Sequence, residues 1–179
     1  MNVAEAIAQR RSIRSFGKQK IEAEKLAAIL EAARLAPSAR NEQQRLFIVI
    51  KQTDMLKKLA FACDSQQQVA ESDVTICCCI PDTDLLTDEN RVLRYEDSAI
   101  ANAFMMLQAT ALGLGSCWIG SFNERKVKSL LRIPDNVAIH SLLALGYAHY
   151  TPPATERKPL SEIVRSEEFP RTMDEERIG

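Results

Sequence analysis

The sequence lacks a strong excess of charge of either sign and lacks long hydrophobic runs. Its 23 lysines and arginines are balanced by 24 aspartates and glutamates, so nothing in the net charge favours nucleic acid or an anionic membrane as a partner. No apolar run approaches the length of a membrane span, and the polar, basic residues 1–20 contain no signal-peptide core. We therefore expect a cytoplasmic protein that binds neither nucleic acid nor membrane.

Cysteine and histidine are also scarce, and their spacing does not fit a metal site. No two of the five cysteines are separated by two residues, and only two histidines are present, so a structural zinc site is not expected. Cys77, Cys78 and Cys79 lie in the apolar run 74–80, where small buried hydrophobic residues are the better interpretation. For Cys117 a reactive thiol and a packing residue are both open, with packing as the default.

Common catalytic and nucleotide-binding motifs are missing as well. The sequence contains no G-x-S-x-G, no Walker loop and no H-E-x-x-H. Gly113 and Gly115 suggest a dinucleotide fingerprint, but Trp118 occupies the third glycine position and the segment follows a helical pattern rather than a strand. These absences argue against a hydrolase and against a Rossmann domain.

The most distinctive stretch that is present is residues 97–120. Between Ser98 and Leu112 the few polar side chains point in different directions at helical spacing, so no polar stripe faces solvent. This pattern predicts a central helix that is buried on all sides. The covering layer is either the core of a monomer or a second copy of the chain.

A short extended segment that contains several glycines follows this helix. Gly113 and Gly115 end the helix, and residues 116–119 follow as a short strand that runs into Gly120. A backbone of this kind allows close approach by a flat ligand. We therefore expect the segment to line a binding site.

The remaining chain alternates helical and extended patterns. Apolar spacing predicts helices over 3–9, 22–35, from 53 onward and 125–131, and apolar runs predict strands over 46–50, 74–80, 116–119 and 138–147. We predict one α+β domain over residues 1–179, with helices flanking a small mixed sheet and the central helix at a dimer interface. The acidic segment 82–90 is a candidate loop or lid. Residues 150–179 are too polar for a core and either fray or lie across another subunit.

Two cationic segments could bind a phosphate. The first is formed by Arg10, Arg11, Ser12 and Arg14, and the second, near the other end, contains Arg157 and Lys158. Guanidinium groups match the oxygens of a phosphate in pairs, although ordinary solvated surface charge is the alternative for either segment alone. Between them, residues 37–43 form a turn of small and amide residues suited to a polar ring edge or a sugar chain.

Four ordered motifs carry a resemblance to a known family. They are R-R-S-I-R-S-F at 10–16, A-P-S-A-R-N-E-Q at 36–43, L-G-L-G-S-C-W-I-G at 112–120, and L-A-L-G-Y-A at 143–148 followed by P-P-A-T-E-R-K-P-L at 152–160. In this order and at these separations the chain resembles the nitroreductase family of FMN-dependent enzymes. The resemblance implies an α+β fold and a homodimer built on long central helices, with one FMN at each of two subunit interfaces.

The resemblance also implies which residues hold the FMN phosphate and the ring. Arg10 and Ser12 would bind the phosphate together with Arg157 and Lys158, and Arg11 would add charge or a backbone contact. Arg14 would face the pyrimidine edge of the flavin, where a cation stabilises the charge that develops on reduction. The other implied contacts are Pro37, Ser38, Ala39 and Asn41 from the second subunit, and Trp118, Ile119 and Gly120 on one ring face, with a backbone N–H directed at N5.

The function implied by the resemblance is that of an oxidoreductase with NADH or NADPH as electron donor. It would reduce nitroaromatic or quinone-like acceptors by ping-pong hydride transfer, and it needs no catalytic side chain because the flavin carries the chemistry. Two alternatives remain: a specialised relative that reduces one natural substrate such as a flavin or an enone, and a flavin-binding protein without turnover. Gln44 and Arg45 stand where the family often has proline and an aromatic residue, so the mouth of the substrate pocket is expected to differ.

Overall fold

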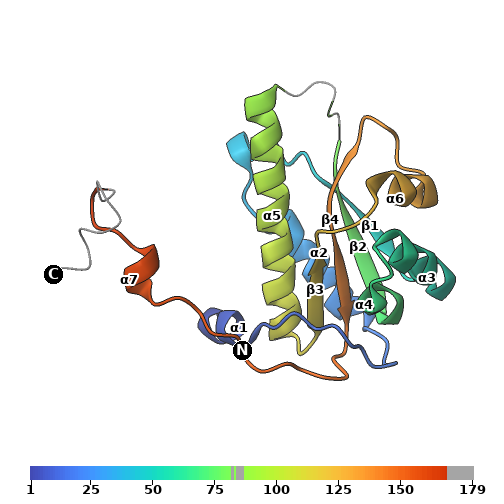
Figure 1. Cartoon of the computed structure of the whole chain (residues 1–179), viewed down its shortest axis with the longest axis horizontal. Coiled ribbons are helices and arrows are strands. Elements are labelled where there is room, and N and C mark those ends of the chain that lie inside the picture. Colours follow the sequence, from blue (N-terminus) through green and yellow to red (C-terminus); the bar gives the residue numbers. More distant parts are fainter. Residues whose placement is uncertain (82, 84–86, 169–179) are drawn as a thin grey trace.

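A four-stranded sheet separates two layers of helices in the computed structural model, which describes residues 1–81, 83 and 87–168 (Figure 1). The strand order is β1 (Leu46–Ile50), β2 (Val74–Ile80), β4 (Ala138–Gly146) and β3 (Gly115–Ile119). All three neighbouring pairs are antiparallel. The α+β class is therefore confirmed, and the expectation of a mixed sheet is wrong for these four strands. Helices follow β1, β2 and β3, and a helical connection can return the chain in either direction, so the sequence pattern could not decide this point.

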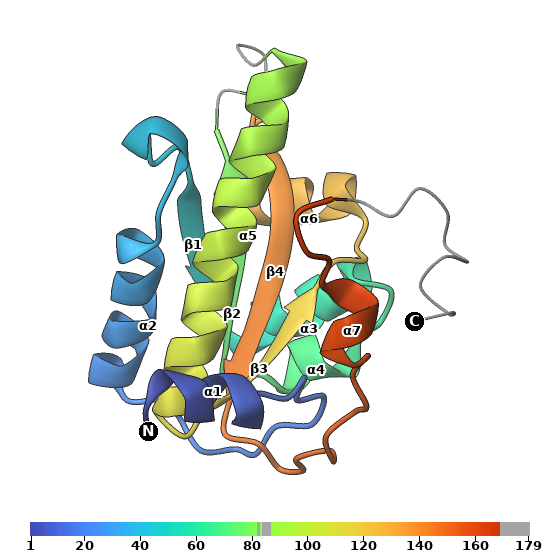
Figure 2. The same cartoon turned by 90° about the vertical axis from the view of Figure 1, so that its left-hand side faces the viewer.

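The two helical layers bury both faces of the sheet. One face is covered by α2 (Ala23–Leu35) and α5 (Asp88–Ala111), and the other by α3 (Thr53–Ala62), α4 (Gln67–Glu71) and α6 (Glu124–Leu131) (Figures 1 and 2). Three short helices lie outside these layers: α1 (Val3–Gln9), η1 (Ala39–Asn41) and α7 (Leu160–Ile163). Because every residue of β2 is buried, the strand is a continuous apolar run rather than an alternating one.

The cysteines belong to the core of this sandwich. Cys77 and Cys79 face the layer of α3, α4 and α6, whereas Ile76 faces α2 and α5. All five cysteines are buried and free of disulfides. Burial raises the pKa of the Cys117 thiol, which disfavours the reactive thiolate. The packing interpretation of the cysteines is confirmed.

The central helix α5 is longer than expected and is covered on one side only. It begins at Asp88 after Thr87, whose side chain caps it, so residues 88–90 of the expected loop 82–90 are helical, while 82 and 84–86 lie outside the described residues. Its inner face is packed on the sheet, but Phe104 on the outer face is 40% exposed. The prediction of burial on all sides is wrong for a single chain, because the sheet covers only one side of a rod.

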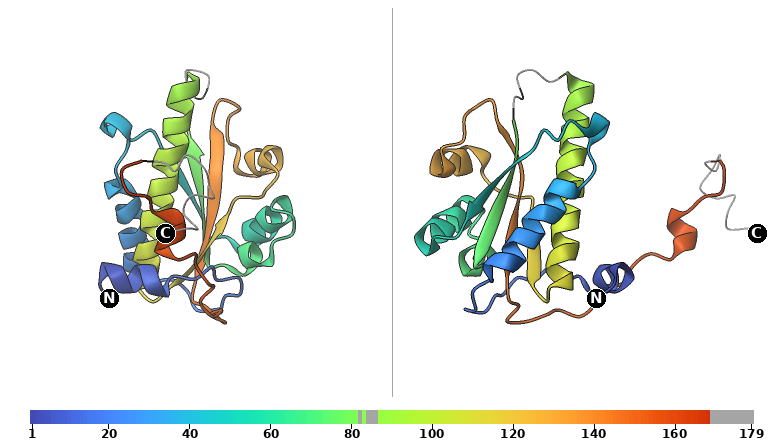
Figure 3. Two further views of the ribbon diagram at one scale, coloured as in Figure 1. Left: turned by 60° about the vertical axis from the view of Figure 1, so that its left-hand side comes forward. Right: turned by 180° about the vertical axis from the view of Figure 1, so that it is seen from behind.

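The chain after β4 leaves the body of the molecule. Most residues from Tyr150 onward are exposed, and α7 stands apart from the sheet (Figures 1 and 3). Residues 169–179 lie outside the described residues, so the expectation that the tail lies across another subunit stays a prediction. Within the described ranges no helix is both long and apolar enough to cross a bilayer.

Candidate functional site

The N-terminal basic segment (residues 10–16) is attached to the edge strand β3. Ile13 donates its backbone N–H to the carbonyl oxygen of Ser116 at 2.9 Å, and Ser12 forms an isolated parallel bridge with Ser116. A second isolated bridge holds Phe16 just beyond the end of β4. The structure therefore brings two of the sequence motifs, the basic segment and the β3 segment, side by side.

Two glycines make this attachment possible. A Cβ at Gly115 would lie 2.7 Å from Cγ1 of Ile13, and a Cβ at Gly146 would lie 2.8 Å from Cδ1 of Phe16, both closer than real contacts allow. The space beside Gly115 is filled by Ile13, so this glycine serves the packing of the basic segment. Gly120 is different, because it is exposed and a Cβ there would meet nothing closer than 3.8 Å.

The arginines of the basic segment have different roles. The Nη1 group of Arg11 donates to the carbonyl oxygens of Ala8 at 2.7 Å and Arg10 at 2.8 Å, at the C-terminal end of α1. No ion pair or side-chain hydrogen bond engages the guanidinium groups of Arg10 and Arg14 within the part of the chain that the structure describes. Two cations beside β3 are therefore free to bind an anion.

The second cationic pair has partners within its own segment. Arg157 and Lys158 lie on the exposed tail, where Arg157 donates to the hydroxyl of Thr155 at 2.8 Å and Lys158 pairs with Glu162 at 3.9 Å. Both are thus engaged by neighbouring residues of the tail. Their expected part in phosphate binding stays a prediction.

The outer edge of β3 offers backbone groups beside the basic segment. β3 pairs with β4 on one side, and Ser116 directs its carbonyl group to the other side, toward Ile13. Because backbone groups alternate along a strand, Trp118 also directs its N–H and C=O away from β4. Ile119 directs its own toward β4 and is buried, so it supports the segment from behind. The backbone of Trp118 is thus directed outward, and the expected backbone donor near a flat ligand stays a prediction.

Aromatic side chains pack against one another beside β3, on the side of the sheet that faces α5. The Trp118 and His140 rings are T-shaped with centroids 5.4 Å apart, and Tyr95 of α5 lies 5.7 Å from His140. Burial lowers the pKa of His140, whose Nδ1 lies 2.8 Å from the hydroxyl of Ser141. Burial therefore favours the neutral form of this imidazole. No group of three or more metal-ligand side chains occurs in the described ranges.

The segment 36–45 is held at the other end of α5 by buried charges that the sequence analysis missed. Asp97 accepts a hydrogen bond from the backbone N–H of Ala39 at 2.8 Å, and Arg94 forms an ion pair with Glu42. Both lie among other charged residues in the N-terminal part of α5, so no local sequence signal singled them out. Arg40, Asn41 and Gln43 have φ values of 53°, 55° and 56°. A left-handed conformation costs each of these residues about 1 kcal/mol or more.

The buried side chain of Arg45 also holds this segment in place. It is only 8% exposed, and its guanidinium donates to the carbonyl oxygens of Ala36 at 2.5 Å and Pro37 at 3.1 Å. These carbonyls lie at the C-terminal end of α2, where helical partners are missing. Arg45 therefore caps the C-terminal end of α2. The expectation that the mouth of the substrate pocket differs at this position stays a prediction.

The two groups of expected ligand contacts lie at opposite ends of α5. The basic segment and β3 lie near its C-terminal end, whereas η1 and the preceding turn lie beside its N-terminal half (Figures 1 and 3). One chain thus does not bring Pro37, Ser38, Ala39 and Asn41 next to the basic segment. The expectation that they act on a site in the second subunit stays a prediction.

Comparison with known proteins adds independent information. The sequence pattern of the Nitroreductase family matches residues 7–75 and 82–147. A protein from Archaeoglobus fulgidus, provisionally named NADH dehydrogenase/NAD(P)H nitroreductase, is 37% identical over 142 residues, which cover 77% of this chain and 80% of that protein.

Solved structures agree with this match. A nitroreductase family protein from Clostridium difficile 630 has a TM-score of 0.84 and 34% identity, with 94% of this chain and 100% of that one covered. An FMN-dependent nitroreductase from Clostridium difficile R20291 has a TM-score of 0.80 and 28% identity, with 92% and 98% covered.

Proposed function

Because the chain belongs to the nitroreductase family, we propose that it is an FMN-dependent oxidoreductase that reduces nitroaromatic or quinone-like acceptors. It is an enzyme of the NAD(P)H-dependent nitroreductase and FMN reductase group. One observation supports the finer proposal most strongly. The backbone bridge between Ser12 and Ser116 joins the segment that carries Arg10 and Arg14 to the outer edge of β3, and this supports the proposal.

The residues along this edge fit the two parts of FMN. Arg10 and Arg14 have no competing ion pair in the described part of the chain, and the partly buried Ser12 lies between them in the sequence. Bidentate guanidinium groups suit a phosphate. Further along the edge, the backbone of Trp118 and the exposed Gly120 suit the flat ring. The donor set thus matches a ligand with an anionic end and a planar end.

The chain's own residues would bind and orient the cofactor rather than react. Bound FMN supplies hydride chemistry between NADH or NADPH and the acceptor. In our proposal Arg10 and Ser12 hold the phosphate, and Arg14 stabilises negative charge at the pyrimidine edge. The segment 118–120 covers one face of the ring, so donor and acceptor use the remaining face in turn. This arrangement requires ping-pong kinetics.

A second copy of the chain would complete the site. The outer face of α5 and the N-terminal helix α1 enclose an apolar hollow of about 420 Å³, lined by Met1, Val3, Phe104 and Leu107 among others. Apolar surface of this kind is typical of subunit contacts. In the proposed homodimer, Pro37, Ser38, Ala39 and Asn41 of one subunit approach the basic segment of the other.

The purified protein tests the proposal directly. We expect a yellow solution whose pigment is FMN after release by denaturation. NAD(P)H alone should bleach the flavin without oxygen, and a quinone added afterwards should restore the colour, with parallel lines in double-reciprocal initial-rate plots. A colourless protein that stays colourless after incubation with FMN would overturn the proposal, and intersecting lines would contradict the shared face.

The acceptor series separates the remaining alternatives. FMN binding without NAD(P)H oxidation in the presence of any quinone would make the chain a flavin-binding protein without turnover. A much higher kcat/KM for free flavin or for an enone than for nitroaromatics and quinones would make it a specialised reductase. Similar kcat/KM values across nitroaromatics and quinones would support the broad activity proposed here.

A further inference from the structure

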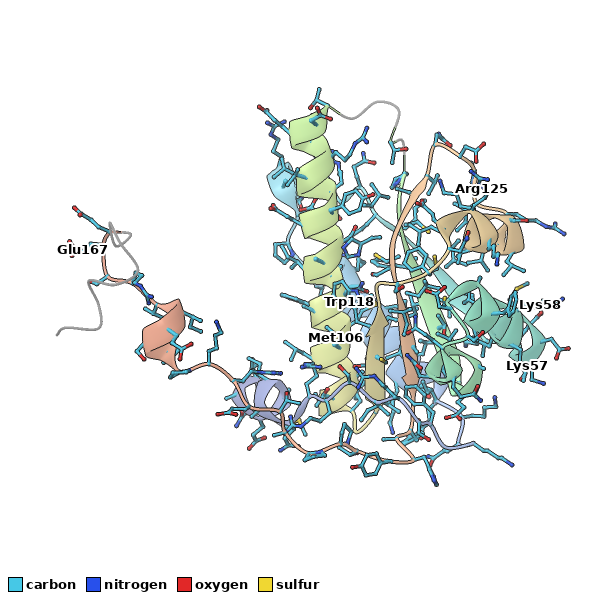
Figure 4. All side chains as sticks on the ribbon, viewed as in Figure 1. Lys57, Lys58, Met106, Trp118, Arg125 and Glu167 are labelled. Atoms are coloured by element: carbon cyan, nitrogen blue, oxygen red, sulfur yellow. The ribbon has the colours of Figure 1, made fainter. Side chains whose placement is uncertain are left out.

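A second concave surface lies on the face of the sheet opposite to α5. The helices α3 and α6 border an open groove of about 710 Å³, whose apolar lining residues are Phe61, Ala62 and Leu130. Figure 4 shows Lys57 and Lys58 on α3 and Arg125 on α6 on this side of the molecule, away from Trp118. The groove is therefore separate from the edge of β3, where the proposed FMN site lies.

The exposed Phe61 is not explained by the fold. Leu56, Leu59 and Ala60 form the buried face of α3, so the core does not need an aromatic residue at position 61. Phe61 nevertheless lines the groove with 69% of its surface exposed. An exposed aromatic ring in a concave surface is a common anchor for a ligand.

The rim of the groove carries a local excess of positive charge. Lys57, Lys58, Arg125 and Lys126 line it, and none of them forms an ion pair with a carboxylate in the described ranges. Lys126 instead places its Nζ 5.1 Å from the centre of the Phe61 ring. Other lysines, such as Lys20 with Asp73, do have carboxylate partners. Because the whole chain has a net charge of -1, this concentration of cations is a property of the groove.

We propose that the groove binds a small aromatic anion, with the ring on Phe61 and the anionic group between Lys126 and the other rim cations. The volume lies within the range of about 300–1,000 Å³ typical of small-molecule sites. A nucleic-acid backbone would not use the apolar lining residues, and a purely apolar ligand would not use the cations. The inference does not depend on the proposed FMN chemistry, because it concerns residues on the other side of the sheet.

Three matched probes test the chemistry on the FMN-loaded protein. Naphthalene-2-sulfonate has both ring and charge, naphthalene-2-methanol has the ring alone, and methanesulfonate has the charge alone. Calorimetry counts all binding, while flavin absorbance reports only binding near the ring of the cofactor. We expect naphthalene-2-sulfonate to bind at one site per chain and to leave the flavin spectrum unchanged. Naphthalene-2-methanol and methanesulfonate should each bind at this site at least about tenfold more weakly.

Variants locate that site. Phe61→Ala and Lys126→Glu should each weaken the spectrally silent site about three- to tenfold, as expected for one ring contact or one exposed charge. Lys51→Glu, an equivalent charge reversal at an exposed position outside the groove, should have no effect. Circular dichroism and flavin content check that each variant is folded.

Several outcomes would overturn the inference. The first is that no site is found that leaves the flavin spectrum unchanged. The second is that neither Phe61→Ala nor Lys126→Glu weakens binding at that site. The third is that methanesulfonate or naphthalene-2-methanol binds there as tightly as naphthalene-2-sulfonate. Tighter binding of the peptide acetyl-Glu-Glu-Phe-Glu-Glu-amide than of the sulfonate would assign the groove to a protein partner instead. Calorimetry with the same probes and variants also works on protein without flavin. If the FMN proposal fails, the groove can therefore still be tested.

Discussion

The two histidines lie in different surroundings, and only His140 is enclosed. Its ring is packed against Trp118 and Tyr95, and burial lowers its pKa, whereas His149 is exposed. In the unfolded chain the imidazole takes up a proton near the ordinary pKa of about 6.5. Below that pH the unfolded state therefore binds more protons than the folded state. The free energy of unfolding should fall as the pH falls through this window.

We predict that His140→Gln flattens this pH dependence. Urea denaturation between pH 7.5 and 5.5 should show a decline in the free energy of unfolding for the wild type, with a slope of at most about 1.4 kcal/mol per pH unit from one group. The slope should be smaller in His140→Gln and unchanged in His149→Gln. Equal slopes in the wild type and both variants would show that His140 is protonated as readily in the folded state as in the unfolded one.

Arg10 is the residue on which the phosphate assignment depends most. A charge-assisted hydrogen bond contributes about 1.5–3 kcal/mol, and about 1.4 kcal/mol is a tenfold change in affinity. Arg10→Ala should therefore weaken FMN binding about tenfold to a hundredfold and barely change the binding of riboflavin, which lacks the phosphate. Stability should be unaffected, because Arg10 has no side-chain partner within the described residues. Calorimetry that finds both ligands weakened equally would contradict the assignment.

At the scale of elements, the segment 36–45 is the most constrained connection. Arg45→Met should leave the carbonyl groups of Ala36 and Pro37 without a donor, at a cost of about 2–3 kcal/mol in the free energy of unfolding. Arg40→Met changes an exposed arginine in the same segment and should stay within about 0.5 kcal/mol of the wild type. Urea denaturation measures both. Equal stability of the two variants would mean that Arg45 contributes no net capping energy.

The sequence predicted those strands that are covered by helices on both faces. Apolar runs predicted β1, β2 and β4 because helices cover both faces of the sheet. The start of α5 was not predicted, since its first turns are polar and depend on the cap at Thr87. The direction of the strands and the inward position of Arg45 also escaped the analysis. Both are set by packing between segments that are distant in the sequence, which local patterns do not encode.

At the scale of the whole molecule, the candidate site was predictable only in part. The motif order implied that the basic segment and the β3 segment act together, and the bridge between Ser12 and Ser116 agrees with this expectation. The segment 37–41 and the cations Arg157 and Lys158 lie elsewhere in the chain. In our proposal their place in the site is set by the arrangement of two copies. The pattern of a single sequence does not contain that arrangement.

The proposed homodimer gives the last prediction. Phe104 lines the apolar hollow on the outer face of α5, so Phe104→Glu would desolvate a charge without a counter-ion in a subunit interface. We expect this variant to be monomeric by light scattering at micromolar concentration and to lose FMN at the same time. Phe61→Glu introduces the same charge at an even more exposed phenylalanine on the opposite side of the sheet, and it should remain dimeric and flavin-loaded. A dimeric, FMN-loaded Phe104→Glu protein would show that α5 is not the interface, and a wild-type monomer that holds FMN would show that one chain suffices for the site.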